Sequence, residues 1–237
     1  MGSTRFAGKV LAELAGKPVL QWVVEAVQKI VLIDHVVVAT TDREEDAEIQ
    51  GWCESFGVEC FRGASEDVLK RYFDCATQLE ATHILRITAD CPLLDSETSE
   101  TVLQMGLEAK AHYFFLSGEF PDGLDTEGFT MEALSVAHHN AVLKSEREHV
   151  TSYFRNQPQG FQILPVALFQ NLGHVRITLD YPEDLSALSG LVREMQNQDL
   201  RINPEEISKI LTKRPHLLAE NRHIERNDGY ARSLLAD

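Results

Sequence analysis

The sequence predicts an α/β protein with a largely parallel sheet covered by helices on both faces. Short β-branched apolar runs alternate along the chain with longer segments of helical period, which is the pattern of a doubly covered sheet. One run, HVVVAT at 35–40, has no polar alternation and is typical of a strand buried on both faces. No linker or fixed-period repeat divides the 237 residues, so we expect a single domain, 1–237.

In the first half of the chain, turn and cap residues mark where the elements begin and end. Pro18 suits the first position of a helix, where its missing N–H costs nothing. Ser65 is a plausible N-cap, and Gly57 suits the left-handed position after a helix. The expected elements here are helices at 18–30, 43–56 and 66–80 and strands at 35–40, 58–62 and 82–88.

The second half continues the alternation of strands and helices. Apolar residues recur at helical spacing in five segments and form short aromatic or β-branched runs in four others. Ligands bind such sheets at the carboxyl ends of the strands, so the residues that follow the strands carry the functional information. The expected elements are helices at 95–110, 131–142, 146–156, 182–198 and 204–212 and strands at 112–116, 127–129, 161–166 and 174–179.

Composition excludes several classes of protein. The formal net charge of −15 argues against a nucleic-acid backbone footprint, which needs a basic face. No apolar run reaches the roughly 18–20 residues that span a bilayer, and the N-terminus lacks the apolar core of a secretory signal. Four cysteines form no CxxC pair, so we expect reduced, packed thiols rather than a zinc ribbon. A cytoplasmic protein with no nucleic-acid or membrane partner is expected.

Two segments of the sequence echo each other: RITAD at 86–90 and RITLD at 176–180. Each is an apolar strand that ends in an aspartate, Asp90 or Asp180. If the two strand ends are neighbours, these carboxylates form an oxygen-rich site that suits Mg²⁺. The alternative is that each aspartate caps the following helix. Capping explains Asp90 less well, because Cys91 and Pro92 interrupt regular structure directly after it.

The first nine residues form a short basic stretch, GSTRFAGK after Met1. Its glycines let backbone N–H groups approach a phosphate, and Arg5 and Lys9 supply positive charge. The stretch is not a Walker A loop, since Ser3 and Val10 hold positions where that motif needs glycine and a hydroxyl residue. The alternative is a solvated basic terminus.

Three further loops carry polar residues that could bind a ligand. The loop at 63–69 enters a helix and is explained by capping alone, with Arg71 one turn beyond Asp67. The turn at 121–125 begins a cluster of carboxylates that could bind sugar hydroxyls or simply be solvated. A lone histidine at a helix start is more often a surface residue than a catalyst. The candidates in the last two regions are Asp122, Asp125, Glu127, Arg147 and His149.

Six segments in this order resemble the spore-coat polysaccharide biosynthesis protein F group of cytidylyltransferases, which is similar to the CMP-Kdo and CMP-sialic acid synthetases. The resemblance implies a nucleotide-diphospho-sugar transferase-like three-layer sandwich with a mixed, mostly parallel sheet. It also implies transfer of CMP from CTP to a sugar, usually an acidic one, with release of pyrophosphate, and a homodimer. The segments are MGSTRFAGK, GASEDVLKRY, RITADCPLLD, PDGLDTEGF, EREHVT and RITLDYPEDL.

The resemblance also assigns roles to residues of this chain. The N-terminal loop would wrap the triphosphate, with Arg5 and Lys9 stabilising the departing pyrophosphate. Asp90 and Asp180 would hold the cofactor Mg²⁺, with Asp90 essential for catalysis. The remaining roles are loop contacts to the nucleotide phosphates by Gly2, Ser3 and Thr4, nucleotide-side contacts by Asp67 and Arg71, and sugar-side contacts by Asp122, Asp125, Glu127, Arg147 and His149.

The chain departs from the group's pattern in three places. Ala7 stands where proline is usual, and Ala89 stands where glycine is usual. An apolar strand that normally precedes the loop is absent, so we expect a sheet that lacks its first, central strand. One alternative is therefore a truncated, catalytically impaired homologue that binds a nucleotide or partner. Another is a glycosyltransferase of related fold, which the absence of an Asp-x-Asp motif disfavours.

Overall fold

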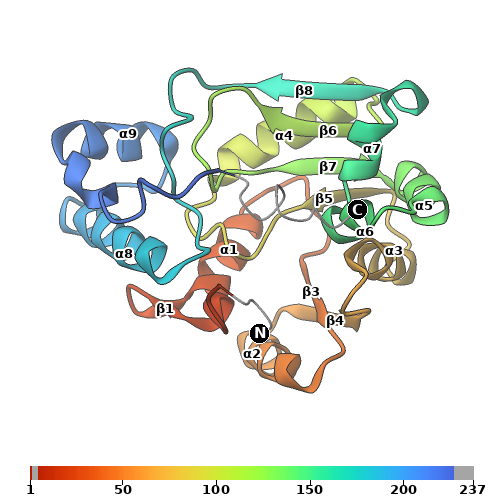
Figure 1. Ribbon diagram of the computed structural model, residues 1–237, viewed down its shortest axis with the longest axis horizontal. Coiled ribbons are helices and arrows are strands. Elements are labelled where there is room, and N and C mark those ends of the chain that lie inside the picture. Colours follow the sequence, from red (N-terminus) through yellow and green to blue (C-terminus); the bar gives the residue numbers. More distant parts are fainter. Residues whose placement is uncertain (2–4, 227–237) are drawn as a thin grey trace.

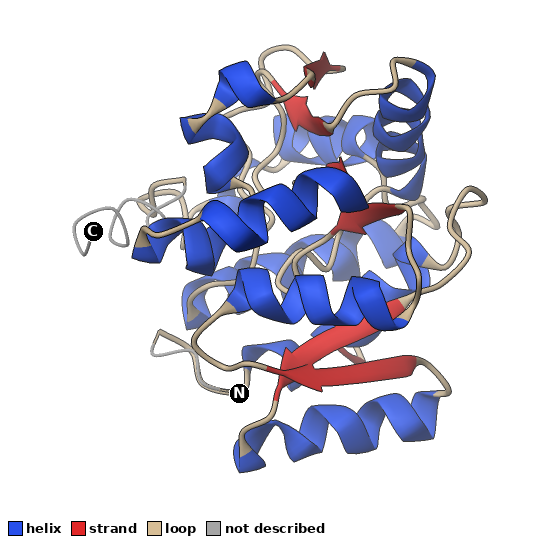
Figure 2. Cartoon of the chain, turned by 90° about the vertical axis from the view of Figure 1, so that its right-hand side faces the viewer, coloured by secondary structure: helices blue, strands red, loops and turns tan. Residues whose placement is uncertain are grey.

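A computed structural model describes Met1 and residues 5–226. The strands of this part form a two-stranded hairpin, a parallel pair and a four-stranded sheet, with helices on both sides of the strands (Figure 2). Figure 1 shows β8, β6 and β7 stacked in that order, with α8 and α9 at one end and α3, α5 and α6 at the other. The α/β class expected from the alternating pattern is confirmed.

The N-terminal part holds a hairpin that the apolar pattern did not predict. After a 3₁₀ turn, η1 (Lys9–Leu11), strands β1 (Glu13–Leu14) and β2 (Lys17–Pro18) pair antiparallel. The turn between them uses Ala15 and Gly16, both with positive φ. Pro18 therefore ends a strand and precedes helix α1 (Val19–Val27), which is shorter than the expected helix at 18–30.

The next unit pairs β3 (Val37–Thr41) with β4 (Glu59–Gly63) in parallel. The expected helix at 43–56 begins as a 3₁₀ turn, η2 (Glu44–Asp46), and continues as α2 (Ala47–Phe56). The turn is tight because the Asp46 carboxylate accepts hydrogen bonds from the hydroxyls of Thr40 (2.8 Å) and Thr41 (2.5 Å). Helix α3 (Val68–Gln78) follows and is capped by Asp67, which accepts from the Lys70 N–H at 2.8 Å, rather than by Ser65.

The larger sheet has the order β5-β7-β6-β8. Its strands are β5 (His83–Arg86), β6 (Tyr113–Ser117), β7 (Glu127–Thr130) and β8 (Ile163–Ala167). Only β7 runs against its neighbours β5 and β6, so the sheet is mixed and the other three strands share one direction. Gly128 of β7 faces the Phe114 ring, and a Cβ there would lie 2.1 Å from a ring carbon. The close packing of β7 on β6 therefore requires glycine at this position.

Two expected elements are wrong in detail. The segment 174–179 makes an isolated parallel bridge, Asp122 to Arg176, instead of a strand. The expected helix at 146–156 is broken into α6 (Lys144–His149) and α7 (Ser152–Asn156). The break falls at Val150, which has φ 60° and ψ −60°, a strained conformation for a β-branched residue. The remaining helices are α4 (Ser96–Glu108), α5 (Met131–Asn140), α8 (Pro182–Asn197), α9 (Pro204–Lys213) and the 3₁₀ turns η3 (Pro158–Gly160) and η4 (Pro215–Leu218).

A cavity of about 920 Å³ separates the parallel pair from the larger sheet. Residues 35–39 of the β3 region and 82–89 of the β5 region line it, together with apolar residues of α1 and α3. Among the described residues, β3 and β5 are both edge strands of their sheets. The gap between the two groups of strands therefore lies between β3 and β5.

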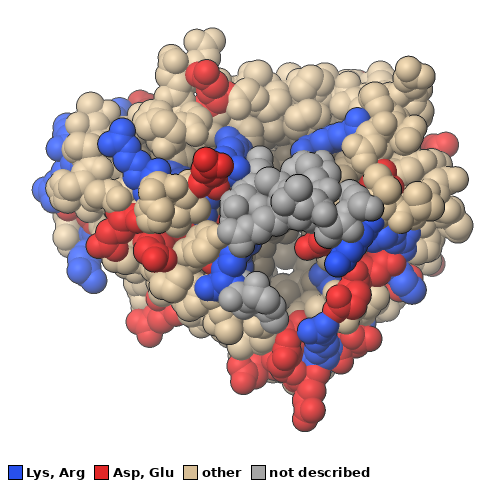
Figure 3. Space-filling model, viewed as in Figure 1, with Lys and Arg blue, Asp and Glu red and all other residues tan. Residues whose placement is uncertain are grey.

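The surface carries charged side chains of both signs (Figure 3), and the cysteines are free thiols, as expected. Acidic side chains gather over α2 and the turn before it, with basic side chains scattered across the same face (Figure 3). The four cysteines are free, and burial raises the pKa of the Cys53 thiol to about 12. In the part of the chain that the structure describes, no helix is both long and apolar enough to cross a membrane.

Candidate functional site

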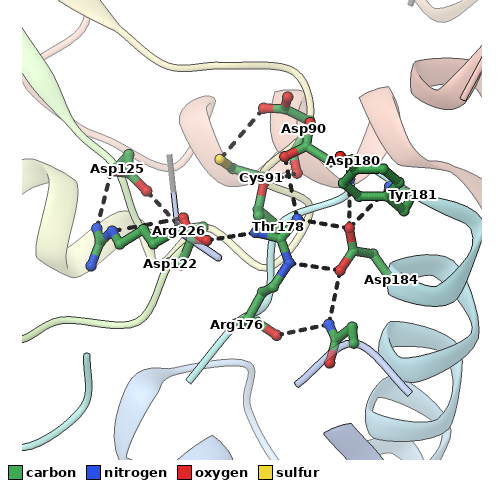
Figure 4. A network of polar contacts seen from close by, with 12 residues as sticks. Asp90, Cys91, Asp122, Asp125, Arg176, Thr178, Asp180, Tyr181, Asp184 and Arg226 are labelled. Atoms are coloured by element: carbon green, nitrogen blue, oxygen red, sulfur yellow. Dashed lines mark hydrogen bonds and ion pairs between the residues drawn. The ribbon is translucent and has the colours of Figure 1, made fainter. Parts of the chain in front are cut away.

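The structure brings Asp90 and Asp180 together at one site (Figure 4). Their two segments are joined by the main chain, because the Leu179 N–H donates to the Asp90 carbonyl at 2.8 Å. The Thr178 hydroxyl donates to the same carbonyl at 3.1 Å. The echoing segments of the sequence therefore lie side by side, and the spacing of the two carboxylates is set by backbone contacts.

Both cations of the N-terminal loop reach these carboxylates. Lys9 Nζ lies 2.7 Å from Asp90 Oδ2 and 2.9 Å from Asp180 Oδ1. Arg5 Nη2 lies 2.7 Å from Asp180 Oδ1, and its guanidinium stacks over the Tyr181 ring. Burial alone would raise the pKa of Asp90, but the charge and hydrogen bond of Lys9 outweigh it and lower that pKa. Gly2, Ser3 and Thr4 lie outside the described residues.

Helix capping does not account for the two aspartates. Helix α4 is capped by Asp95, whose carboxylate accepts from the Thr98 N–H at 2.9 Å. At the start of α8 the carboxylate of Asp184 accepts from the N–H groups of Asp180 (2.8 Å) and Tyr181 (3.0 Å). Nearby aspartates thus cap both helices, and the side chains of Asp90 and Asp180 are left to face Lys9.

A buried arginine that the sequence analysis did not single out, Arg176, supports this site. Its guanidinium donates to Asp184 at 2.8 Å through both Nε and Nη2, to Asp122 at 2.8 Å and to Asp180 at 3.3 Å. The side chain of Asn221 in turn donates to Asp184 at 2.9 Å. Arg176 opens the segment RITLD, as Arg86 opens RITAD, so the repeated arginine was a signal that could have identified both.

Asp122 and Asp125 lie beside this arginine and are held from the other side by Arg226. Arg226 Nη2 lies 3.2 Å from Asp125 Oδ1, and Arg226 Nη1 donates to the Phe120 carbonyl at 2.9 Å. Burial and the nearby charge of Asp125 raise the pKa of Asp122 to about 6. The turn needs Gly123, because its φ is +114° and a Cβ would lie 2.7 Å from the Ile177 carbonyl carbon.

The raised pKa of Asp122 predicts a specific pH dependence. The folded protein keeps this proton up to about pH 6, whereas an unperturbed carboxyl releases it near 3.8. Folding therefore takes up a proton in this interval, so raising the pH from about 4 to 6 costs stability. We expect wild type to lose stability relative to Asp122→Asn across this interval, measured by urea unfolding at several pH values. A difference that is constant or of opposite slope would contradict the assignment.

Glu127 anchors a second polar cluster at the start of β7. Its buried carboxylate accepts hydrogen bonds from Arg86 (2.7 Å), Arg155 (2.7 Å), Tyr113 (2.6 Å) and Thr151 (2.8 Å). Burial would raise the pKa of Glu127, but the two arginines outweigh it and lower that pKa. Four donors already hold the carboxylate, so its most evident role is to position the arginines beside it.

The other expected substrate and nucleotide residues lie in a third region around the start of α3. Arg147 donates to Asp67 Oδ2 from Nε at 3.0 Å and from Nη2 at 2.5 Å, so these two predicted site residues form an ion pair with each other. Arg71 donates to the Ala64 carbonyl at 2.7 Å, and burial lowers its pKa. His149 is half-buried at the end of α6, and burial lowers its pKa as well.

The donor set at Asp90 and Asp180 fits Mg²⁺. The Lys9 ammonium contacts both carboxylates, and their negative charges favour a cation at this position. In the described residues no group of three or more Asp, Glu, His or Cys side chains could hold a metal ion. Mg²⁺ commonly uses one or two carboxylates and takes its other ligands from water and substrate phosphates. The pair therefore suits a metal that arrives with a nucleotide.

Comparison with known proteins agrees with the geometry. The family model for cytidylyltransferases matches residues 1–213. An uncharacterized protein of Methanocaldococcus jannaschii is 32% identical over 228 residues, which cover 94% of this chain and 91% of that protein. The spore coat polysaccharide biosynthesis protein SpsF of Bacillus subtilis is 28% identical over 227 residues, covering 93% of this chain and 94% of SpsF.

A solved structure confirms the expected fold. A cytidylyltransferase from Leptospira borgpetersenii serovar Hardjo-bovis superposes with a TM-score of 0.86 at 27% identity, and the match covers 95% of both chains. The family model, the two relatives and this structure each match most of the chain, and the residues that the family model matches include Asp90 and Asp180. The chain belongs to the cytidylyltransferase family.

Proposed function

We propose that this protein transfers CMP from CTP to an acidic sugar, with release of pyrophosphate, in the synthesis of a surface polysaccharide. The observation that carries the proposal is the pair Asp90 and Asp180, fixed by the main chain and contacted by the two cations of the N-terminal loop. SpsF, whose name refers to spore coat polysaccharide, supports the pathway class. A homodimer, implied by the family resemblance, is part of the proposal.

The residues of the site suit phosphoryl transfer, which depends mainly on positioning and charge neutralisation. Asp90 and Asp180 would hold Mg²⁺, which supplies charge neutralisation at the phosphates when bound. Arg5 and Lys9 would stabilise the negative charge that develops on the departing pyrophosphate. Arg176 donates to the second carboxylate oxygen of Asp180, Oδ2, at 3.3 Å, whereas Arg5 and Lys9 contact Oδ1.

Acidic sugars are favoured by the cations of the second and third clusters. Arg86 and Arg155 both form ion pairs with Glu127, so the arginines outnumber the carboxylate that they contact. In the third region Arg147 forms an ion pair with Asp67. An arginine can bind a sugar carboxylate with two parallel hydrogen bonds, which gives both strength and orientation. His149 lies close enough to this region for Arg86, Arg155 and Glu127 to influence its pKa.

The test is pyrophosphate release with each of the four nucleoside triphosphates, Mg²⁺ and a panel of acidic and neutral sugars. We expect release with CTP and an acidic sugar, and little with other nucleotides or neutral sugars. Release that is equal for all four nucleotides would contradict the proposal, as would release that requires no sugar.

The cavity between β3 and β5 favours a second candidate function, nucleotide binding without efficient turnover. The cavity separates the β3–β4 pair from β5, the strand that Asp90 follows, and among the described residues no strand lies between them. CTP with Mg²⁺ would then raise the melting temperature, but no pyrophosphate would appear with any sugar. Stabilisation together with sugar-dependent release would exclude this candidate.

The same cavity predicts the effect of a designed extension. Met1, Val38 and Ala89 pack against the same buried cluster, and Val38 and Ala89 also line the cavity. An apolar strand joined to Met1 therefore starts close to the gap between β3 and β5. Five β-branched residues placed there would bury apolar area and pair both edges, and we expect the melting temperature to rise by about 5–10 °C. Differential scanning calorimetry measures it.

A Gly-Ser extension of equal length is the matched control, because it also removes the Met1 ammonium from its contact with Asp46. If both extensions change the melting temperature equally, the cavity does not accept a strand.

A further inference from the structure

Lys9 occupies the position between the two carboxylates of the proposed metal site. Its Nζ atom lies 2.7 Å from Asp90 and 2.9 Å from Asp180, and its side chain is only 12% exposed. Burial opposes the charge on Lys9, but the two aspartates outweigh it and raise the pKa of the ammonium. A full positive charge is thus enclosed beside both carboxylates.

The ammonium and a metal ion cannot share this position. Mg²⁺ binds oxygen ligands at roughly 2.0–2.1 Å in near-ideal octahedral geometry. A metal between Asp90 Oδ2 and Asp180 Oδ1 would lie in contact with Lys9 Nζ, where two positive charges repel strongly in a site shielded from water. Lys9 must therefore leave the carboxylates when a metal binds them both.

Binding of the triphosphate is hindered in a similar way, because its phosphates compete with the aspartates for the same cations. Lys9 and Arg5 both contact Asp180 Oδ1, so neither can turn to a phosphate without giving up that oxygen. If they left without a metal present, Asp90 would face the phosphates without the Lys9 ammonium, and Asp180 would keep only its 3.3 Å contact with Arg176. Each ligand is thus hindered when it binds alone.

We infer that the Lys9 ammonium is the counter-ion of Asp90 and Asp180 in the free protein and is exchanged when ligands bind. The metal replaces the ammonium at the two carboxylates, and the ammonium moves to the triphosphate. The nucleotide half of this exchange rests on the proposed function, whereas the metal half needs only Asp90, Asp180 and Lys9. Gly8, with φ 69°, lies directly before Lys9 and gives the loop a backbone position that tolerates left-handed conformations. The exchange makes binding of the two ligands mutually favourable.

The first test follows Lys9 in the wild-type protein. Lysines are acylated with a limiting amine-reactive reagent, and the labelling rate of each is measured by mass spectrometry. We expect saturating Mg²⁺ alone to increase Lys9 labelling several-fold, and CTP added to Mg²⁺ to reduce it again. Lys17 is the internal control, because it lies outside the site and its Nζ atom contacts a Glu25 carboxylate oxygen at 2.7 Å. Unchanged Lys9 labelling on addition of Mg²⁺ would overturn the inference.

The second test uses Lys9→Met, which keeps the length of the side chain and removes its charge. We expect this variant to bind Mn²⁺ alone about 10-fold more tightly than wild type, within the usual range of coupling between two ligands. It should bind preformed Mn²⁺–CTP more weakly, a change of opposite sign that a purely structural role would not produce. Free Mn²⁺ is measured by electron paramagnetic resonance, and binding of the complex by calorimetry.

Lys17→Met is the matched variant, because it removes the same charge from a lysine–carboxylate pair outside the site. Equal Mn²⁺ affinity of wild type and Lys9→Met would overturn the inference. If Lys9→Met does not fold, the labelling result in wild type decides. Neither test uses turnover, so a protein that releases pyrophosphate without the Lys9 exchange refutes only this inference. A protein that shows the exchange but no transfer refutes only the proposed function.

Discussion

Asp90→Asn is expected to lower kcat for pyrophosphate release by about 10³-fold, because on the proposed function it removes one of the two charges that would hold Mg²⁺. The asparagine keeps the shape of the side chain, and the Lys9 ammonium retains its contact with Asp180. The main-chain carbonyl of residue 90 still accepts from Leu179, so the two strand ends stay joined. The variant should therefore keep a melting temperature close to that of wild type while losing activity.

Asp74→Asn provides the comparison for this prediction. Asp74 pairs with Lys70 on the exposed face of α3, and its replacement removes the same charge away from the site. We expect its kcat to match that of wild type. Near wild-type turnover in Asp90→Asn would show that the metal assignment is wrong, whereas equal losses in both variants would point to a general effect of charge.

Arg176→Met is expected to cost about 3–5 kcal/mol of unfolding free energy, the usual result of removing one partner from a buried ionic cluster. Arg176 is 6% exposed and contacts Asp122, Asp180 and Asp184. Without the guanidinium, Asp184 keeps the backbone N–H groups of residues 180 and 181 and the amide of Asn221, but Asp122 loses its closest cation. Urea unfolding measures the change.

The control for this prediction is Arg201→Met. Arg201 also forms an ion pair with a carboxylate, Glu97, at 2.7 Å, but both side chains are more than two-thirds exposed. Solvent screens such a pair, so we expect little change in stability. A similarly small effect for Arg176→Met would mean that the buried cluster does not hold the segment 176–184 in place.

The sequence alone located the two aspartates because their signal is local. Each of the segments RITAD and RITLD combines a β-branched apolar run with a terminal carboxylate, and the direction of strands in an α/β sheet places such ends together. The structure then brings Asp90 and Asp180 to the same ammonium. The cap residues that compete with this reading, Asp95 and Asp184, lie only four or five positions away, so the sequence left both readings open.

Other features depend on contacts that no local pattern contains. Apolar spacing runs smoothly through 146–156, but the helix breaks at Val150, which has a positive φ, and the next residue, Thr151, donates to Glu127. The segment 174–179 has a strand-like composition, yet its N–H groups at residues 177 and 179 are divided between Asp122 and Asp90. Its hydrogen bonds thus join two loops instead of extending a sheet.

The role of Arg176 was missed for a related reason. An arginine in an apolar strand can face solvent or a buried carboxylate, and its partners Asp122 and Asp184 lie 54 and 8 residues away. Only the fold decides between these two possibilities. Similarly, the contacts of Lys9 with Asp90 and Asp180 join residues that lie 81 and 171 positions apart, so no local pattern predicts them.

The central claim, that the site at Asp90 and Asp180 moves the α-phosphate of CTP to a sugar, is tested most directly by following labelled phosphorus. CTP labelled at the α or at the γ position is incubated with the protein, Mg²⁺ and the acidic sugar that supports pyrophosphate release. We predict that the α label appears in a CMP-sugar and the γ label in pyrophosphate, in equal amounts, with neither product formed by Asp90→Asn. An α label that remains in CTP or appears only as free CMP would contradict the account.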